Sequence, residues 1–546
     1  MVLLQKVIYL LLLKNKVKIK KPFYYLFWLF FIVAVGSLIR LYSLTQVPPA
    51  LHGDESGIGY NAYSLIRTGV DEYGKSYPFT FRNDFSPLIF YATLPWVFLM
   101  GFSDLSTRLP TAFIGILFLP VIYLLVIKLF ENQKLALLTT FLIMMASWHI
   151  RSSRMALEMI WALFFQLIGI LLFLSDSSKH RWKLVFSFIS FGLSVITYQS
   201  AKITTPLIIL SLILLNIDSF KKRWKIYLVL LSLCIVPPLL GYFLARPFKD
   251  MRFVGISVFA VWRSMLPPNT STFSMSNLFS LIHMIVDNYL KHFDPRILFF
   301  DSSSLRYFQV ENVGMFYVWQ IFGIASGLFF LIRNIKQKAS QFILSLIIIS
   351  PVPASLTSGV PFANIGRNLL MFPALEIICA IGIMGTFRFV RKTYGKKWVL
   401  IFTILFSVVI SWQFGLFMNN YFLDMPTRFA SFWGQPLKEA MPFITKQETS
   451  VNKIVITDSV KQAYMYLLLY GKKEPIWVQE QIKVRHPIVG YSKIGKYEFR
   501  PIDWSTEQNE PNVLLVGSTQ EIPENDSILY EVKQSDNKVL LRVVKT

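Results

Sequence analysis

The chain has 546 residues, of which 54% are hydrophobic, and a formal net charge of +24 at pH 7. Apolar runs of about 20 residues, long enough to cross roughly 30 Å of hydrocarbon, recur through most of the chain, so we exclude a soluble protein and predict a polytopic membrane protein. The basic residues form short clusters between these runs, which indicates membrane topology and contact with anionic lipid rather than nucleic acid. Cys234 and Cys379 both lie inside apolar runs, so neither a disulfide framework nor a CxxC metal site is expected.

The apolar runs predict about eleven transmembrane helices. Their approximate ranges are 23–43, 108–129, 135–150, 157–175, 183–198, 203–217, 226–245, 313–332, 340–356, 368–387 and 398–417. Short cytoplasmic loops collect Lys and Arg, and the basic clusters at 14–21, 179–183, 221–225, 333–338 and 388–397 fall on one side if the N-terminus is cytoplasmic. The sequence therefore predicts a multi-pass protein of the plasma or inner membrane with its N-terminus inside.

The apolar segment at 87–102 resembles a further span in length. If it crossed the membrane, the loops after it would change sides and the charge pattern would break. We therefore expect an amphipathic helix that lies at the outer interface, within a first outer loop at 44–107. A second long outer loop is expected at 246–312.

The tail of the chain has a different character from the rest. The short apolar runs KIVITD, NVLLVGS, SILYEV and VLLRVV predict strands, and a helical stretch is expected at 458–471. An odd number of spans places this segment outside the membrane. The predicted organisation is a membrane domain at 1–419 and a small extracytoplasmic α/β domain at 420–546.

Two adjacent acids, Asp54 and Glu55, stand at the exit of the first predicted span. Ionisable side chains near a membrane are costly unless they pair, reach water or perform chemistry. These two follow a Pro-Pro pair and a glycine, and they open a helix-like stretch, DESGIGYNAYSLIRTG. Two interpretations are open: the acids cap the helix, or one of them is a general base that deprotonates an acceptor hydroxyl.

Three stretches, DESGIGYNAYSLIRTG, FRNDFSPLIFYATLP and STRLPTAFIGIL, resemble in order and spacing the first outer loop of the protein O-mannosyltransferases and aminoarabinose transferases. These enzymes are C-class membrane glycosyltransferases, of glycosyltransferase family 39 and its bacterial relatives. The resemblance covers residues 1–250 well and extends more loosely through PVPASLTSGVPFANIGRNLLMFPAL at 351–375. It implies a polytopic α-helical C-class fold that transfers a single sugar from a polyprenyl phosphate carrier to an acceptor on the outer face.

The resemblance also implies roles for residues of the first outer loop. Asp54 matches the loop acid proposed as catalytic base, and Glu55 matches the neighbour that supports it. Asp84, a candidate for binding the substrate or the carrier phosphate, falls near an acid that precedes a Pro-Pro-Leu motif in relatives. This chain reads DFSPLIFY there, and Phe85 replaces a lysine that many relatives carry, so a phosphate contact assigned to that lysine is in question. Arg108 matches a family arginine and is expected to hold the carrier phosphate, the alternative being an interfacial anchor.

Further charged residues stand at the outer ends of later spans. Arg154, a substrate- or phosphate-binding candidate, and Glu158 are four residues apart, so on one helix they would form an ion pair. Relatives carry an acid near Glu158, which is expected to support the site or bind sugar; His149 is a weaker candidate. Lys202 and Arg367 each place one cation in a short outer turn, as a membrane anchor or as a ligand of the leaving phosphate, and Arg367 is preferred for the second role.

The remaining polar residues receive simpler interpretations. Asp71, Glu72 and Lys75 stand in the turn-rich stretch VDEYGKSYP and are expected to be solvated. A metal site drawn from His283, His292 and an acid lacks a zinc-type spacing, so no metal ligands are assigned. No cofactor is expected, with a divalent cation left open.

The sequence thus predicts an inverting glycosyltransferase with a polyprenyl-phosphate-linked sugar donor and an extracytoplasmic lipid, glycan or protein as acceptor, embedded among membrane lipids. Two hypotheses from other classes stay open. One is a transporter or flippase for a lipid-linked sugar, although the spans show no repeated halves of the kind that transporters contain. The other is a non-catalytic membrane scaffold with an outer binding domain.

Overall fold

The computed structural model describes residues 22–77, 81, 87–176, 181–244, 257–266, 274–305, 307–357, 365–460, 462–481, 491–525, 527–534 and 536–546. Asp84 lies outside the described residues. The chain divides into two compact units. The first comprises Met1–Tyr42, Thr111–Ser153 and Glu158–Met418, and the second comprises Ser43–Pro110, Arg154–Leu157 and Asn419–Thr546.

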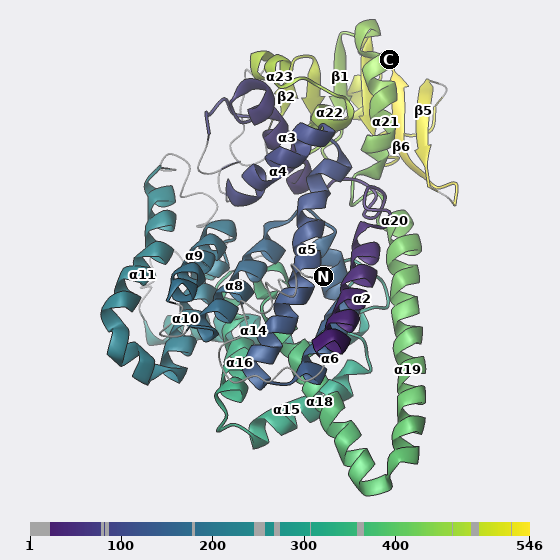
Figure 1. Ribbon diagram of the computed structural model, residues 1–546. Coiled ribbons are helices and arrows are strands. Elements are labelled where there is room, and N and C mark those ends of the chain that lie inside the picture. The colour runs from purple at the N-terminus through teal and green to yellow at the C-terminus, as the bar shows by residue number, and fades with distance from the viewer. Residues whose placement is uncertain are drawn as a thin grey trace. The chain divides into compact units, whose positions relative to one another are not determined.

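The first unit is helical (Figure 1). Its helices are α2 (Pro22–Leu41), α5 (Asp104–Phe130, whose residues 104–110 belong to the second unit), α6 (Gln133–Met145), α7 (Ser147–Ser153), α8 (Glu158–Leu174), α9 (Trp182–Thr197), α10 (Ala201–Leu215), α11 (Ile217–Leu244), α13 (Val258–Met265), α14 (Met275–Leu290), α15 (Gln320–Arg333), α16 (Lys338–Ile349), α17 (Val352–Ser355), α18 (Met371–Tyr394) and α19 (Lys396–Asn419). Every predicted span overlaps one of these helices or a consecutive pair of them, so the prediction of helix is confirmed for each.

Five helices of the described chain are long and apolar enough to cross a membrane. They are Phe23–Leu41, Asp104–Phe130, Lys338–Ser355, Met371–Tyr394 and Lys396–Arg428, and a sixth span results if the bent pair α6 and α7 is taken as one. Other apolar helices, α8 among them, have 10–17 residues. Because an α-helix rises about 1.5 Å per residue, these helices are shorter than the roughly 30 Å of a hydrocarbon core. The number of crossings, and the interfacial position of 87–102, stay predictions.

One predicted span is broken at Ala146, where the extended backbone separates α6 from α7 and the two axes differ by 62°. A helix end leaves carbonyl groups without an intrahelical partner. Here side chains supply the donors: the Arg40 guanidinium donates to the carbonyl oxygen of Met144 at 3.3 Å, and the Tyr317 hydroxyl donates to that of Met145 at 2.6 Å. The break is therefore stabilised by residues far away in the sequence.

The second unit contains a six-stranded mixed sheet in the order β2-β3-β1-β4-β6-β5. The strands are β1 (Lys453–Ile456), β2 (Lys493–Ile494), β3 (Tyr497–Phe499), β4 (Val513–Gly517), β5 (Ile528–Lys533) and β6 (Val539–Lys545). β1 pairs in parallel with β3 and β4, and the other pairings are antiparallel. The four predicted strands are confirmed as β1, β4, β5 and β6, whereas β2 and β3 are too short to leave a hydrophobic period.

Within the described residues, seven α-helices accompany this sheet. They are α3 (Gly53–Thr68), α4 (Pro87–Met100), α20 (Met425–Arg428), α21 (Gln435–Lys446), α22 (Tyr464–Tyr470), α23 (Pro475–Gln481) and α24 (Trp504–Glu507). The first two come from the first outer loop, and α3 contacts both α22 and α23 (Figure 1). The helix predicted within 458–471 is confirmed as α22.

The core of the second unit joins the first outer loop to the tail. Ala50 and Tyr60, from the loop, lie in one cluster of buried residues with Leu437, Ile454 and Tyr466 from the tail. Burial of apolar surface is the main source of folding free energy, so this shared cluster couples the stability of the two segments. The units therefore differ from the predicted division at 419/420, because the first outer loop packs with the tail.

Candidate active site

Helix α3 begins at the two acids singled out in the sequence. His52 is its N-cap residue: its Nδ1 accepts a hydrogen bond from the main-chain N–H of Asp54 at 3.3 Å. The Glu55 carboxylate accepts one from the main-chain N–H of His52 at 3.1 Å, which completes a capping box. The predicted helix is confirmed, and Glu55 is a capping residue.

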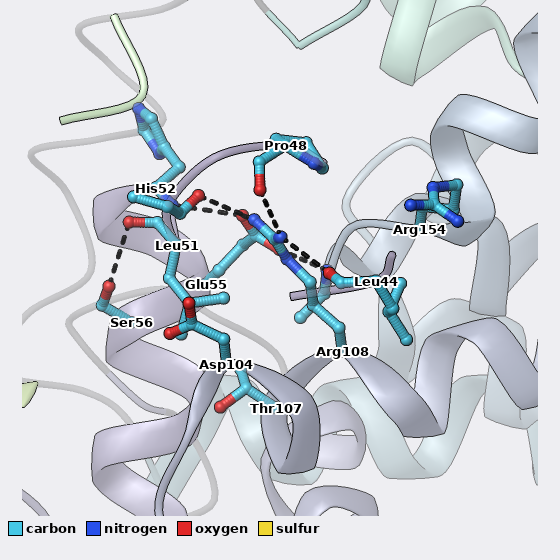
Figure 2. Close-up of polar contacts among 12 residues, drawn as sticks. Leu44, Pro48, Leu51, His52, Glu55, Ser56, Asp104, Thr107, Arg108 and Arg154 are labelled. Carbon is cyan, nitrogen blue, oxygen red and sulfur yellow. Dashed lines mark hydrogen bonds and ion pairs between the residues drawn. The ribbon is translucent and has the colours of Figure 1, made fainter. Parts of the chain in front are cut away.

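Glu55 is also half of a buried ion pair with Arg108. The Nε of Arg108 donates to Oε1 at 3.0 Å and its Nη2 donates to Oε2 at 3.1 Å, a bidentate arrangement in which both side chains are fully buried (Figure 2). The main-chain N–H of Ala156 donates to Oε1 as well, at 2.8 Å. Charge-assisted bidentate pairs are strong and fix the orientation of both groups, so Glu55 is held rigidly.

The other donors of Arg108 bind the chain that precedes α3. Nη1 donates to the carbonyl oxygens of Leu44 at 3.0 Å and Pro48 at 2.7 Å, and Nη2 donates to that of Ala50 at 2.7 Å (Figure 2). A guanidinium has five N–H groups, and all five of Arg108 therefore have acceptors within the protein. These contacts give Arg108 a structural task; its use as a phosphate ligand stays a prediction.

Asp54 has a different environment from Glu55. Its side chain is 13% exposed. The Nε2 of Gln462, from the tail, donates to Oδ1 at 3.4 Å, and Nδ1 of His52 lies 4.0 Å from Oδ2. Glu55 is thus a buried structural residue, whereas water or a substrate can reach Asp54.

The tail holds the turn before α3 through Asp104, the first residue of α5. Lys438 Nζ lies 2.6 Å from Oδ2 of Asp104, and the Tyr470 hydroxyl donates to Oδ1 at 2.9 Å. Burial raises the pKa of Tyr470, so its hydroxyl stays protonated and able to donate. Its oxygen also accepts from the main-chain N–H of Leu51 at 3.2 Å, and Lys438 donates to the carbonyl oxygen of Pro49 at 2.9 Å.

The prediction that Asp71 and Glu72 are solvated is wrong. Their exposed fractions are 0% and 1%. Asp71 Oδ1 accepts from two main-chain N–H groups of its own turn, at 2.9 and 2.8 Å. Glu72 accepts from Asn61 Nδ2 at 3.2 Å and from the Tyr464 hydroxyl at 3.5 Å. The sequence predicted this turn, but the residues that bury it belong to α3 and to the tail.

Arg154 belongs to the same unit as Asp54 and is buried. Its Nη2 donates to the carbonyl oxygens of Val47 at 2.9 Å and Ser43 at 3.1 Å, and its guanidinium lies 4.7 Å from the ring centre of Phe422. Burial lowers the pKa of Arg154. Residues 154–157 are not helical, so the predicted helical spacing between Arg154 and Glu158 is wrong.

The remaining described candidates belong to the first unit. Glu158 is half-buried at the start of α8, Lys202 is exposed in the first turn of α10, and Arg367 is half-buried in a short 3-10 helix. His149 is fully buried, with Nδ1 2.6 Å from the Nη2 of Arg40. The proposed roles of Glu158, Lys202 and Arg367 in binding stay predictions.

The residues considered for a metal site make other contacts. His292 is buried with Nδ1 2.8 Å from the carbonyl oxygen of Asn288, and Asp294 forms an ion pair with Arg296 at 2.7 Å. A carbonyl oxygen at this distance favours the proton on Nδ1, which leaves Nε2 as the nitrogen with a lone pair. Among the residues that the structure describes, no three His, Cys, Asp or Glu side chains gather as metal ligands.

The residues that sequence reasoning missed come mostly from the tail. Gln462, Lys438 and Tyr470 are separated from α3 by several hundred positions, and none stands in a local motif. His52 gave no signal because a capping box usually starts with Ser or Thr. The sequence signal for this capping box was the position of Glu55, three residues after His52.

The fold of this chain is similar to that of ArnT, in agreement with the fold that the sequence resemblance implied. The structure of ArnT from Cupriavidus metallidurans in the apo state matches with a TM-score of 0.54 and 13% identity, over 95% of this chain and 98% of that one. The structure of ArnT bound to undecaprenyl phosphate matches with a TM-score of 0.52 and 14% identity, over 94% and 98% of the two chains. At this level of identity the likeness shows the fold.

A more distant match is the archaeal oligosaccharyltransferase AglB from Archaeoglobus fulgidus, in complex with an inhibitory peptide and a dolichol-phosphate, with a TM-score of 0.49 and 13% identity. The match covers 82% of this chain but only 60% of AglB, so this chain spans less than two thirds of that protein's length. No family model and no curated protein sequence matches the chain.

Proposed function

We propose that this protein is a membrane glycosyltransferase that moves a single sugar from a polyprenyl phosphate carrier to an acceptor outside the cytoplasm. The observation that carries the proposal is the fold, which it shares over 94% of its length with ArnT in complex with undecaprenyl phosphate. In this proposal the protein is multi-pass, its N-terminus is cytoplasmic, and the second unit lies on the outer side. The acceptor is a lipid, a glycan or a protein.

Asp54 is the general base in this proposal. Of the two adjacent acids, Glu55 has its carboxylate engaged by Arg108, Ala156 and His52, whereas Asp54 is partly exposed. Asp54 also stands in the first turn of α3, where the helix dipole favours a negative charge and so keeps the base ionised.

The reaction is a single displacement at the anomeric carbon. Asp54 accepts the proton of the acceptor hydroxyl as its oxygen bonds to the anomeric carbon. The bond from that carbon to the phosphate oxygen breaks, and its electron pair leaves with the polyprenyl phosphate. Attack from the face opposite the phosphate inverts the configuration.

The departing phosphate requires positive charge. Arg154, Lys202 and Arg367 are the cations that we propose for this task, with Asp84 and Glu158 as sugar-side candidates. Arg108 would have to release carbonyl and carboxylate acceptors to bind a phosphate, so we propose that it supports the loop.

The test has two stages, beginning with the product. Mass spectrometry of surface lipids, glycans and proteins from cells with and without the protein identifies a species that gains one sugar unit. Purified full-length protein in nanodiscs, given polyprenyl-linked sugars extracted from the same membranes, then transfers that sugar to the identified acceptor. If no surface species changes by one sugar unit, the proposal of transfer is wrong.

The second stage is the variant Asp54→Asn, which removes the base at nearly constant size. We expect transfer to fall at least about 100-fold, with an unchanged melting temperature and unchanged binding of undecaprenyl phosphate. Asp536→Asn, an exposed aspartate of the same unit, is the matched control and should keep full activity. Undiminished transfer by Asp54→Asn would remove Asp54 from the role of base. Retained export of lipid-linked sugar without transfer would favour the transporter hypothesis.

A further inference from the structure

The tail reaches the candidate base through one loop. This loop follows the carboxyl end of β1, the strand that pairs in parallel with both β3 and β4, and it leads into α22. In open α/β sheets the carboxyl ends of parallel strands are the usual place for functional loops. Gln462 lies in this loop with a φ of +61°, a conformation that is unfavourable for any residue except glycine.

The side chain of Gln462 packs directly on the first turn of α3. Its Nε2 donates to Oδ1 of Asp54 at 3.4 Å. A Cβ added to Gly53 would lie 2.4 Å from the Oε1 of Gln462 and 2.9 Å from its Cβ, so the approach requires glycine at position 53. A strained residue that is held against an acid by close packing is a pattern typical of functional sites.

Contacts at both ends of α22 keep this loop in place. At the start of α22, the Tyr464 hydroxyl donates to Glu72 at 3.5 Å, and at its end Tyr470 binds Asp104 and Leu51. The imidazole of His52 stacks on the ring of Phe432 with the ring centres 5.7 Å apart. The position of Gln462 relative to Asp54 is therefore fixed by the packing of the whole unit.

We propose that Gln462 is a positioning residue for Asp54, so that the α/β tail completes the active site and is not a separate binding module. The inference rests on the proposed function, because it deepens the role of the same base. The amide N–H orients the carboxylate and favours its ionised form, which is the form that accepts a proton. Among the residues that the structure describes, the titratable groups next to Asp54 in the sequence are His52 before the helix and Glu55 on it, the second of which is engaged by Arg108.

Two substitutions separate this role from a structural one. Gln462→Gly suits the positive φ, so we expect an unchanged or higher melting temperature together with a fall in transfer of about tenfold. Gln462→Glu replaces the donor by a like charge, which favours the protonated form of Asp54. We therefore expect the acid limb of the rate against pH to move to higher pH by about one unit.

Gln479 offers the matched control. It is also a tail glutamine that donates to α3, through Nε2 to Thr68 Oγ1 at 3.2 Å and to Ser64 Oγ at 3.4 Å, at the end of the helix away from Asp54. Gln479→Ala and Gln479→Glu should leave both the rate and its pH profile unchanged. Gly53→Ala should slow transfer in the wild-type background but add little in the Gln462→Gly background, because the clash it creates is with Gln462.

A readout without catalysis distinguishes failure of this inference from failure of the proposed function. A carbodiimide modifies protonated carboxyl groups, and peptide mass spectrometry of the full-length protein gives the pH midpoint for labelling at Asp54. A higher midpoint in Gln462→Glu, but not in Gln479→Glu, supports the positioning role even if no transfer is found. If the wild type transfers sugar while neither the rate profile nor the labelling midpoint changes in Gln462→Glu, the inference is wrong and the proposed function stands.

Discussion

Both units bury arginines, and two of these, Arg108 and Arg151, have different kinds of hydrogen-bond acceptor. Arg108, in the second unit, forms a bidentate pair with a carboxylate at 3.0 and 3.1 Å. Among the residues that the structure describes, Arg151 of the first unit has dipolar acceptors: it donates to the Ser302 hydroxyl at 2.6 Å, to the carbonyl oxygen of Gly314 at 2.9 Å, to the Ser147 hydroxyl at 3.0 Å and to the carbonyl oxygen of Phe308.

The two arginine sites differ in what remains buried when one interacting side chain is removed. If the carboxylate of a buried pair is removed, a full charge remains without compensation, which costs several kcal/mol. If a cation surrounded by dipoles is removed, only weaker acceptors remain, and the cost of burying the charge disappears with it. The site at α3 is thus expected to be the more sensitive of the two to a single substitution.

The largest effect is expected for Glu55→Ala. It leaves Arg108 buried without its counter-charge, so we expect a loss of about 3–5 kcal/mol of stability, measured by thermal unfolding of the purified protein in nanodiscs. The control is Glu474→Ala, because Glu474 pairs with Arg67 of the same helix but both side chains are more than half exposed, at 54% and 55%. An exposed pair contributes at most about 1 kcal/mol. Equal losses in the two variants would contradict the comparison.

A double replacement tests whether the ion pair alone accounts for the stability of this site. Buried ion pairs can often be replaced by apolar residues without loss, so Glu55→Leu with Arg108→Met would recover full stability if the pair were the whole interaction. Here the carbonyl oxygens of Leu44, Pro48 and Ala50 lose their donors as well. We therefore expect partial recovery, and full recovery would show that these carbonyl contacts contribute little.

An intermediate effect is expected for Arg151→Met. Its acceptors lose a donor, which costs about 2 kcal/mol, but no unpaired charge remains. We expect a smaller fall in melting temperature than for Glu55→Ala, together with faster hydrogen exchange at 307–315, the segment that Arg151 holds through Phe308 and Gly314. Arg333→Met, at an exposed position in the last turn of α15, should change neither quantity. A loss as large as that of Glu55→Ala would refute the distinction between the two sites.

Helices and strands followed from the sequence wherever a local period was present. The apolar runs predicted the helices, and the alternation in the tail predicted β1, β4, β5 and β6. The break at Ala146 could not be predicted, because the run from 135 to 150 contains no Gly or Pro and the donors that stabilise the break come from Arg40 and Tyr317. Local sequence predicts an element, whereas distant partners determine where it bends.

The candidate site shows the same limit. The helix that opens with Asp54 and Glu55 was predicted, since caps and spacing are local signals. The burial of Asp71 and Glu72 was not, because their turn is covered by Asn61 and by the tail. The packing of the first outer loop into the core of the tail has no local signature.

The smallest effect is expected at the surface of the sheet, for Glu531→Gln. Glu531 stands opposite Arg542 on β6, with Oε1 3.1 Å from the arginine Nε, and its Oε2 lies 3.0 Å from Lys533 Nζ. The Lys533 side chain is 52% exposed, whereas Glu531 is 20% and Arg542 only 10% exposed. Arg542 also donates to the carbonyl oxygen of Ile522 at 3.0 Å and the glutamine keeps one acceptor oxygen, so we expect a loss of about 1 kcal/mol or less at pH 7, reduced further by high salt. The exposed Glu524 provides the control, Glu524→Gln.

The pH dependence of this small effect has a defined sign. Hydrogen bonds from Lys533 and Arg542 lower the pKa of Glu531 in the folded protein below its usual value of 4.5. Stability from a carboxylate with a lowered pKa is present above the unfolded value and is lost as the pH falls through the folded one. The difference in melting temperature between wild type and Glu531→Gln should therefore persist at pH 6 to 7 and close on acidification below about pH 4. If this difference in melting temperature stays constant down to acid pH, Glu531 acts through packing rather than through its charge. Glu531 and Glu55 would then differ only in how deeply they are buried.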